Sequence, residues 1–366
     1  MKRFFKLTSL ALVSTFIIGL SGCMGGTNSE YVTSTSEEGN DSVSVTETLE
    51  DDNAFKSATG TLASEVGGQR AIRLGFEGGL CQSSIPIAHL MGFFAEEGLD
   101  TEIVVTGDLV NSRDSLAAGH IDTVAGMLSG WFVPVTQGID IGFLLGLHTG
   151  CASAFVIADS GITEFESGQE IAVSGAIGGA YHNIALRFAY RAGLEPSDFI
   201  WRDFPAAEAV IALQDGTVQV AVIPDQVGQR FVDEGILRRI RSYDDADFAN
   251  DNCCVLGMSG GFIRANPETS ERITRAIYKA SKWLDESDEN KIEAVNLLIE
   301  NGYVSAAVDV SYVVGLMSNW QWGLPHELTE QTLITSITEY QAMDVINPDL
   351  DPELIRTQVW HPFNID

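Results

Sequence analysis

Two side chains able to bind a metal or to act as a nucleophilic pair stand three residues apart in the run LLGLHTGCASAFV. They are His148 and Cys151. A structural zinc site takes four Cys or His ligands, and the sequence has no CxxC or HExxH motif to complete this half of a zinc spacing. No signature of a Cys/His nucleophile surrounds the pair. We therefore predict no metal, no cofactor and no catalytic residue, and we interpret His148 as part of a pocket lining.

A glycine-rich turn in SGAIGGAYHN connects a short apolar run to an amphipathic one. Its glycine spacing differs from the GxGxxG pattern of dinucleotide-binding turns. Free backbone N–H groups at the start of a helix can receive an anionic or strongly polar ligand group. The turn therefore predicts ligand contacts at Gly178, Gly179, Ala180 and Tyr181. A tight turn that merely requires glycines is the alternative interpretation.

Two other apolar runs are followed by polar or aromatic residues. EGGLCQSS offers Gly79, Gln82 and Ser83, and GMLSGW offers Ser129 and Trp131. Glycine allows close backbone approach, the polar side chains can hydrogen-bond, and an indole ring can stack on a ligand. We predict that these five residues contact the ligand. The alternatives are that Ser83 only caps a helix and that Trp131 only packs in the core.

Thr149 and Asp225 are two further candidates for ligand contacts, one neutral and one acidic. GLHTGCAS adds Thr149 beside His148, and IPDQV places Asp225 after the apolar run TVQVAV. Asp225 would favour an amino or cationic group if it faces the ligand, and it only caps a helix in the alternative interpretation. The segments EGGLCQSS, GMLSGW, GLHTGCAS and SGAIGGAYHN contain no Arg or Lys.

The elements that must position these residues alternate in type. From Ala71 onward, short strand-like runs alternate with runs of helical period, which predicts an α/β fold with largely parallel sheets. Residues 83–99 are predicted to form one helix ended by Gly98. Ligands of open α/β sheets gather at the carboxyl ends of strands, and the candidate segments above follow strands.

The N-terminus predicts export. MKRFF is a positive region, LTSLALVSTFIIGL is an apolar region too short to span a bilayer with proper flanks, and LSGC places small residues before Cys23. LSGC resembles the lipobox of bacterial lipoproteins, which implies cleavage before Cys23 and acylation of its thiol. We expect a signal peptide at 1–22 and, from its Ser, Thr, Gly and acidic composition, a disordered acidic tether at 23–69.

Charge excludes one class of partner. The 366-residue chain has a formal net charge of −30, and a polyanion binds nucleic acid poorly because phosphates must be neutralised by Lys and Arg. The acidity indicates a solvated surface and says little about the ligand.

The order of several segments carries a resemblance. GFFAEEGLDTEIVV, DSLAAGHIDTVAG, VTQGIDIGFLLG, EIAVSGAIGGAYHNIALRFAYRAGL, PAAEAVIALQDGTVQVAVIPD and GGFIRANPETSERITRAIYKASKWLDE follow one another over roughly residues 70–300. In this order they resemble the periplasmic-type substrate-binding proteins of nitrate/sulfonate/taurine and thiamine-precursor ABC importers. The resemblance implies a type II-like fold of two α/β lobes joined by two crossover segments and closing around a ligand.

Mapped onto this chain, the implied fold has lobe one at 70–158 plus 252–366 and lobe two at 159–251. The crossings are expected near SAFVIAD and CCVLGMSGG. For an exported chain, one hypothesis is a disulfide such as Cys81 to Cys151, since both cysteines follow strands whose ends should face the same cleft. Adjacent Cys253 and Cys254 should point in opposite directions if extended, as buried small hydrophobic residues.

The resemblance implies a function without chemistry. The leading hypothesis is a monomeric, lipid-anchored protein on the outer face of the cell membrane or in the periplasm. It would deliver a sulfonate-, nitrate- or taurine-like small molecule to an ABC permease and its ATPase. The alternatives are a thiamine-precursor or heteroaromatic-binding protein, a receptor for a sensor kinase, and a secreted enzyme on the same fold.

Overall fold

The computed structural model describes residues 62–107 and 109–364. The signal peptide, Cys23 and most of the tether expected from the sequence lie outside these residues. Among the described residues, no helix is both long enough and apolar enough to cross a membrane.

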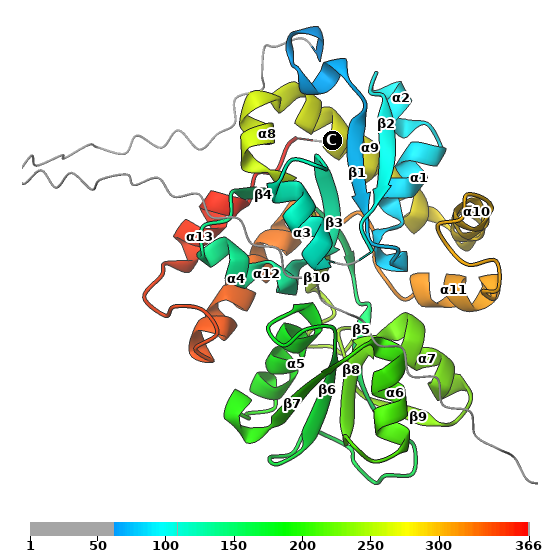
Figure 1. Ribbon diagram of the computed structural model, residues 1–366, viewed down its shortest axis with the longest axis vertical. Coiled ribbons are helices and arrows are strands. Elements are labelled where there is room, and N and C mark those ends of the chain that lie inside the picture. The colour runs from blue at the N-terminus through cyan, green and yellow to red at the C-terminus, as the bar shows by residue number, and fades with distance from the viewer. Residues whose placement is uncertain (1–61, 108, 365–366) are drawn as a thin grey trace, which may run out of the picture. The chain divides into compact units, whose positions relative to one another are not determined.

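The strands form two five-stranded sheets of the same design (Figure 1). The first has the order β2 (Thr101–Val105), β1 (Ile72–Phe76), β3 (Thr123–Met127), β10 (Asn252–Ser259) and β4 (Ile141–Thr149). The second has the order β7 (Ile200–Phe204), β6 (Glu170–Ser174), β8 (Val220–Pro224), β5 (Ala152–Ile157) and β9 (Leu237–Ser242). In each sheet the first three strands are parallel and the fourth is antiparallel to both of its neighbours.

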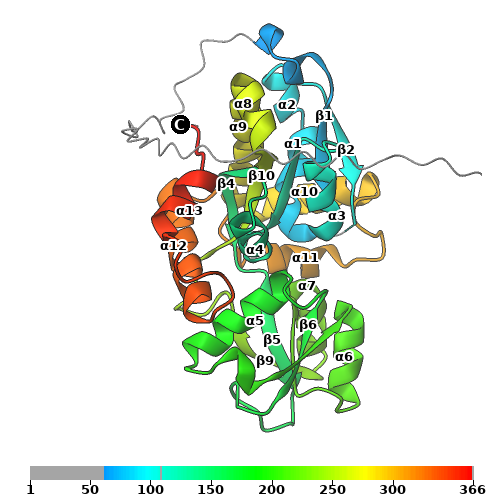
Figure 2. The ribbon, with the colours of Figure 1, turned by 60° about the vertical axis from the view of Figure 1, so that its left-hand side comes forward.

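Helices cover both faces of each sheet. In the second sheet, Ile171 and Val173 of β6 pack with α5 (Ala180–Arg191), whereas Ala172 between them packs with α6 (Ala206–Gln214). This follows from the alternation of side chains along a strand. Figure 2 accordingly shows α5 and α6 on opposite sides of this sheet.

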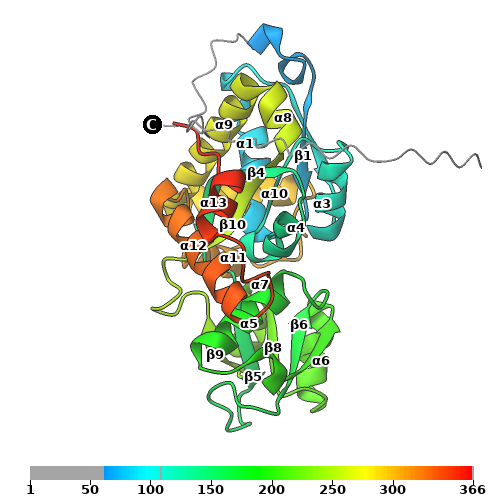
Figure 3. The ribbon, with the colours of Figure 1, turned by 90° about the vertical axis from the view of Figure 1, so that its left-hand side faces the viewer.

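The first sheet is covered in the same way. Its β1 residues Ile72 and Leu74 share a core with α1 (Ser84–Leu90) and α9 (Pro267–Glu286). Phe143 of β4 instead packs in a core with α4 (Phe132–Thr136), α12 (His326–Ala342) and α13 (Pro352–Val359). Figure 3 shows α12 and α13 together on that side.

The remaining helices are α2 (Phe93–Glu96), α3 (Leu109–Ala117), α7 (Asp225–Asp233), α8 (Gly260–Ala265), α10 (Asp288–Glu300) and α11 (Val310–Met317). Short 3-10 turns lie at Leu62–Ser64, Gly67–Gln69, Leu80–Gln82, Leu128–Gly130 and Pro196–Asp198.

The helix predicted over 83–99 is divided in two. Between α1 and α2, Gly92 adopts the left-handed conformation with φ of +80°. A glycine at positive φ ends a helix at little cost, and α2 begins at the next residue, Phe93. The prediction of a continuous helix was therefore wrong at this residue.

The chain passes between the sheets twice. It leaves β4 and enters β5 through Gly150 and Cys151, and it returns from β9 to β10 through residues 243–251. Because β5 pairs with β8 and β9, the first passage lies before the segment SAFVIAD that the resemblance implied. The last two residues of the LHTGC motif, Gly150 and Cys151, are thus the connection between the sheets, and its first three residues end β4.

Candidate functional site

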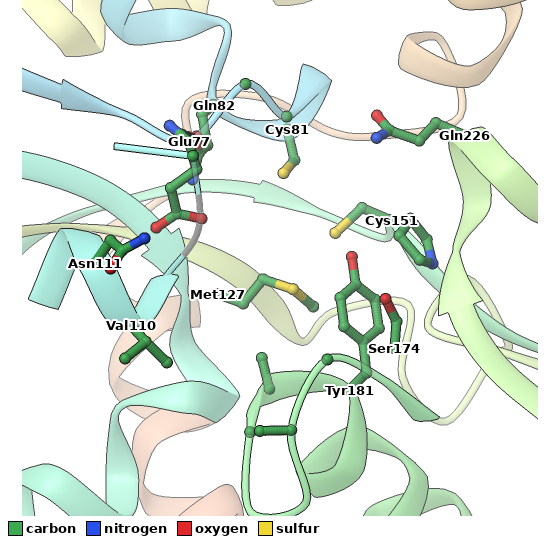
Figure 4. A pocket seen from close by; sticks show the side chains of 18 of the residues that line it. Glu77, Cys81, Gln82, Val110, Asn111, Met127, Cys151, Ser174, Tyr181 and Gln226 are labelled. Carbon is green, nitrogen blue, oxygen red and sulfur yellow. Dashed lines mark hydrogen bonds between the residues drawn. The ribbon is translucent and has the colours of Figure 1, made fainter. Parts of the chain in front are cut away.

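A pocket of about 590 Å³ opens where the strand ends of both sheets meet (Figure 4). A volume of this size suits a small-molecule ligand. The lining residues of the first sheet and its loops are Glu77, Gly78, Gly79, Cys81, Gln82, Gly107, Val110, Asn111, Met127 and, from the C-terminal helical part, Trp320. The connection and the second sheet contribute Cys151, Ser174, Gly175, Ala176, Gly179, Ala180, Tyr181, Pro224 and Gln226. The pocket wall therefore draws on both halves of the fold.

Gln82 holds the first wall of the pocket in place. Its side-chain amide donates to the Ala125 carbonyl of β3 at 2.8 Å, and its amide oxygen accepts from the Glu77 backbone N–H at 2.9 Å. Both ends of the amide are thus used, which ties the loop after β1 to the neighbouring strand. Gln82 is only 2% exposed, so its contribution to the pocket is mainly to shape the wall.

The second wall is the glycine-rich turn that leads into α5. Gly175 and Gly178 have φ of +81°, a conformation that side chains with a Cβ rarely adopt. At Gly179, which has negative φ, an added Cβ would lie 2.8 Å from the Ala176 carbonyl oxygen. The sequence therefore folds here into a tight loop whose backbone reaches the pocket, with the N-terminus of α5 directly behind it.

His182 fixes this turn from inside. Its Nδ1 accepts the Gly178 backbone N–H at 3.2 Å, and its ring packs edge-on to Trp201. Burial lowers the pKa of His182 to about 4. The neutral ring is therefore the form that the folded protein selects.

This burial predicts acid sensitivity. A histidine with a lowered pKa stabilises the fold above its unfolded pKa near 6.5, and the contribution is lost as pH falls through about 4. Between pH 7 and pH 4 the wild type should lose about 3 kcal/mol more unfolding free energy than His182→Gln. Urea unfolding at both pH values measures this, and parallel losses in the two proteins would contradict it.

Five of the residues predicted from the sequence line the pocket. They are Gly79, Gln82, Gly179, Ala180 and Tyr181. The hydroxyl of Tyr181 points toward Cys151 across the pocket (Figure 4). Gly178 lies in the same turn but outside the lining.

The remaining predicted residues are buried behind the wall. Ser83 donates to the Leu80 carbonyl at 2.6 Å, and Ser129 donates to the Ala180 carbonyl at 3.1 Å. Trp131 is 1% exposed and packs edge-on against Phe143, so the ring that was expected to stack on a ligand is a core residue. The short turn after β3 directs it inward.

Thr149 and Asp225 also lie outside the lining. The Thr149 hydroxyl accepts from the Gln321 N–H at 3.1 Å, which ties the end of β4 to the C-terminal segment. Asp225 is 2% exposed, and its nearest cation is Arg239 at 3.8 Å. Burial raises the pKa of Asp225 to about 6. Its neighbour Gln226 faces the pocket instead (Figure 4).

His148 is fully buried and does not reach the pocket as the sequence interpretation expected. Its ring packs against those of Trp320 and Trp322, with ring centroids 5.1 and 5.0 Å away. Burial alone would lower the pKa of His148, but the Cys254 and Cys81 side chains beside it, in their ionised form, raise this pKa to about 10. The surroundings of the ring therefore favour positive charge.

The cysteines meet at this point, although the disulfide hypothesised between Cys81 and Cys151 is absent and both residues are free thiols. The sulfur closest to Cys151 belongs to Cys253, at 2.7 Å. Cys254 also lies in this sulfur group, because irregular register on both sides of it breaks the alternation of β10. The expectation that Cys253 and Cys254 point to opposite faces was therefore wrong.

Sequence reasoning missed most of the side chains that give the pocket its character. The missed residues include Glu77, Val110, Asn111, Met127, Ser174 and Trp320. Glu77 and Ser174 had a usable signal, since they begin quoted strand-end segments. Trp320 had none, because it comes from the helical C-terminal part. The lining includes no Lys or Arg, and Glu77 contributes its carboxylate.

Comparisons with known proteins agree with this geometry. A family model described as NMT1-like matches residues 66–299, and no curated protein matches the sequence. The periplasmic nitrate-binding protein NrtA from Synechocystis PCC 6803 superposes with a TM-score of 0.64 at 16% identity, over 79% of this chain and 86% of that chain. The alkanesulfonate-binding protein SsuA from Xanthomonas axonopodis pv. citri, bound to MOPS, gives 0.64 at 15% identity, over 80% and 98%.

A third solved structure is similar to the same extent. It is the ligand-binding component of an ABC-type import system from Staphylococcus aureus with zinc bound, with a TM-score of 0.65 at 13% identity, over 80% of this chain and 97% of that chain. At such identities the likeness concerns the fold. The α/β periplasmic-binding-protein fold expected from the sequence is confirmed.

Proposed function

This chain belongs to the NMT1-like family, and from that premise we propose that it is an exported solute-binding protein of an ABC importer. The observation that carries the proposal is a pocket of about 590 Å³ whose wall comes from the strand ends of both sheets. A ligand held from both sides stabilises the closed arrangement of two lobes more than the open one. Binding thus becomes a change of shape that a permease can recognise, and no bond is made or broken.

The charges around the pocket indicate the kind of solute. Backbone N–H groups at the start of α5, near Ala180 and Tyr181, suit an anionic head such as a sulfonate. The lining has no Lys or Arg to neutralise a full negative charge, and Glu77 suits an amino group. We propose a small zwitterion of the taurine class, with nitrate, simple sulfonates and heteroaromatic thiamine precursors as the competing ligands.

Native mass spectrometry of freshly purified protein, followed by thermal-shift titration with taurine, alkanesulfonates, nitrate and pyrimidines, tests the solute class. Taurine should raise the melting temperature more than an alkanesulfonate of equal length that lacks the amino group. The reverse order would contradict the zwitterion. Solute-stimulated ATPase activity of the reconstituted importer separates delivery to a permease from a sensor role.

Gly179→Val tests the wall at α5. The added side chain meets the Ala176 carbonyl and displaces the turn, so solute affinity should fall at least ~10-fold. Gly315→Val is the matched control, because an added Cβ at Gly315 on α11 meets no atom within 4 Å. Isothermal titration measures both variants, and unchanged affinity in Gly179→Val would place the solute elsewhere.

Membrane attachment is a separate part of the proposal. The lipobox-like LSGC supports acylation of Cys23, and two or more acyl chains anchor a protein far more firmly than one. Cys23→Ala should move the protein from the membrane fraction to the soluble fraction with its melting temperature unchanged. Equal retention of the variant in the membrane fraction would refute the anchor.

A further inference from the structure

Four side chains with soft or borderline ligand atoms converge at the inner wall of the pocket. The sulfurs of Cys81, Cys151 and Cys254 and a ring nitrogen of His148 all lie within 4.8 Å of one another. They come from four places in the fold: the turn after β1, the end of β4, the connection to β5, and β10. Such spacing is close to that of ligands around one tetrahedral metal ion, so shifts of about 1 Å complete the site.

The histidine is already oriented as a metal ligand. Its Nδ1 lies 2.8 Å from the Thr149 carbonyl oxygen, the kind of contact that metal-bound histidines make through their second nitrogen. Its Nε2 is buried without a hydrogen-bond partner in the described structure. Stacking on Trp320 and a tilted ring contact with Trp322 hold the imidazole in place. The imidazole therefore presents one unpartnered nitrogen on the side where the thiols lie.

The backbone at Cys151 is the second indication. Cys151 has φ of +82°, and the other described non-glycine residue with positive φ is Asp344. This conformation costs a residue with a Cβ about 1–2 kcal/mol, and glycine would adopt it freely. In this conformation Cys151 places its sulfur in the cluster and in the pocket wall.

We propose that Cys81, His148, Cys151 and Cys254 bind one thiophilic metal ion of the Zn²⁺ class. Three thiolates and one imidazole match the tetrahedral Cys₃His set of zinc, and hard ions such as Mg²⁺ and Ca²⁺ prefer oxygen ligands. Cys81 and Cys151 line the pocket, so the ion has a path to the site through it. The inference is independent of delivery to an importer, because it concerns the purified protein alone.

Cys253 supplies a matched control. It is adjacent to Cys254 on β10, both are almost fully buried, and its sulfur lies 2.7 Å from that of Cys151, yet it is outside the four-residue cluster. Cys253→Ala keeps all four ligands and also removes the nearest partner with which Cys151 could form a disulfide. Cys254→Ala deletes one ligand by the same change in the same strand.

The experiment titrates untagged, metal-free protein, kept reduced with a phosphine, with Zn²⁺ by competition against a chromophoric chelator and with Co²⁺ by absorption spectroscopy. Wild type and Cys253→Ala should bind one ion each and show thiolate-to-cobalt charge transfer with tetrahedral d–d bands. Cys254→Ala should bind Zn²⁺ at least ~100-fold more weakly, since loss of a ligand costs more than loss of a residue that orients one.

Cys81→Ser provides a second test on a partly exposed residue of the pocket wall, so it does not depend on repacking the core. It should weaken Zn²⁺ binding as Cys254→Ala does. No stoichiometric binding by reduced wild type, an octahedral cobalt spectrum, or equal losses in Cys253→Ala and Cys254→Ala would each overturn the proposed site. The taurine titration is separate, so failure of either proposal leaves the other measurable.

Discussion

Arg187→Met is expected to lower the free energy of unfolding by about 3–5 kcal/mol, because it removes the centre of a buried ion-pair cluster. Arg187 on α5 is 1% exposed and pairs with Glu339 of α12, with Asp251 at 2.7 Å and with the Tyr243 hydroxyl at 2.7 Å. Without the guanidinium, two largely buried carboxylates lose their strongest partner. Urea unfolding monitored by circular dichroism measures the loss.

The ion-pair cluster around Arg187 also connects two parts of the fold. Arg187 and Arg191 belong to the half of the chain that carries the second sheet, whereas Glu339 belongs to a helix packed on the first sheet. The cluster therefore joins the part of the chain that carries the second sheet to a helix packed on the first sheet. Arg191 still reaches Glu339 at 2.7 Å, which favours the lower end of the expected range.

Arg202→Met is the matched control for this prediction. Arg202 pairs with Glu170 between two strands of the second sheet, but both side chains are substantially exposed. Solvent and salt screen such a pair, so its loss should leave the urea midpoint nearly unchanged. Equal midpoints for Arg187→Met and Arg202→Met would show that the buried cluster does not stabilise the fold.

The fold was predictable because its local signals are consistent with one another. EIAVSG and AYHNIALRFAYR became β6 and α5, since Ile171 and Val173 alternate on a strand while Ile184 and Phe188 recur at helical spacing. The apolar residues of the strand and those of the helix pack in one core, so the periodicity of the sequence alone identifies both elements. The break at Gly92 was not predicted, because a glycine inside a helical pattern does not reveal its φ.

The pocket was predictable only where the backbone makes it. The glycine-rich turn reaches the pocket at Gly179, and Gln82 follows a strand end as expected. Whether a side chain after a strand turns outward or inward depends on the tertiary contacts of that turn. Trp131 follows β3 and is buried, whereas Trp320, far along the chain, lines the pocket.

The cysteine–histidine cluster was invisible for another reason. Zinc motifs are recognised when two ligands of each pair are close in sequence, and here only His148 and Cys151 satisfy that condition. Cys81 and Cys254 arrive from separate strands, and irregular pairing of β10 brings the sulfur of Cys254 to the cluster. The four side chains of the cluster are therefore brought together by the topology of the fold and not by their spacing in the sequence.

Gly150→Ala is expected to destabilise the protein through the connection between the sheets. Gly150 has φ of +80°, which costs alanine about 1–2 kcal/mol. An added Cβ would also lie 2.4 Å from the Trp320 ring and 2.6 Å from the Asp244 carboxylate, and such overpacking costs roughly 1–3 kcal/mol more. Trp320 must move off the His148 ring, so tryptophan fluorescence of the folded variant should change as well.

Gly161→Ala separates the two causes, because Gly161 has φ of +75° and an added Cβ there meets no atom within 4 Å. Only the backbone cost applies to this control, and its tryptophan fluorescence should match that of the wild type. The difference between the two variants in unfolding free energy therefore measures the contact of Gly150 with Trp320 and Asp244. Equal losses would mean that Trp320 and Asp244 yield to the added Cβ without cost, which would contradict the prediction.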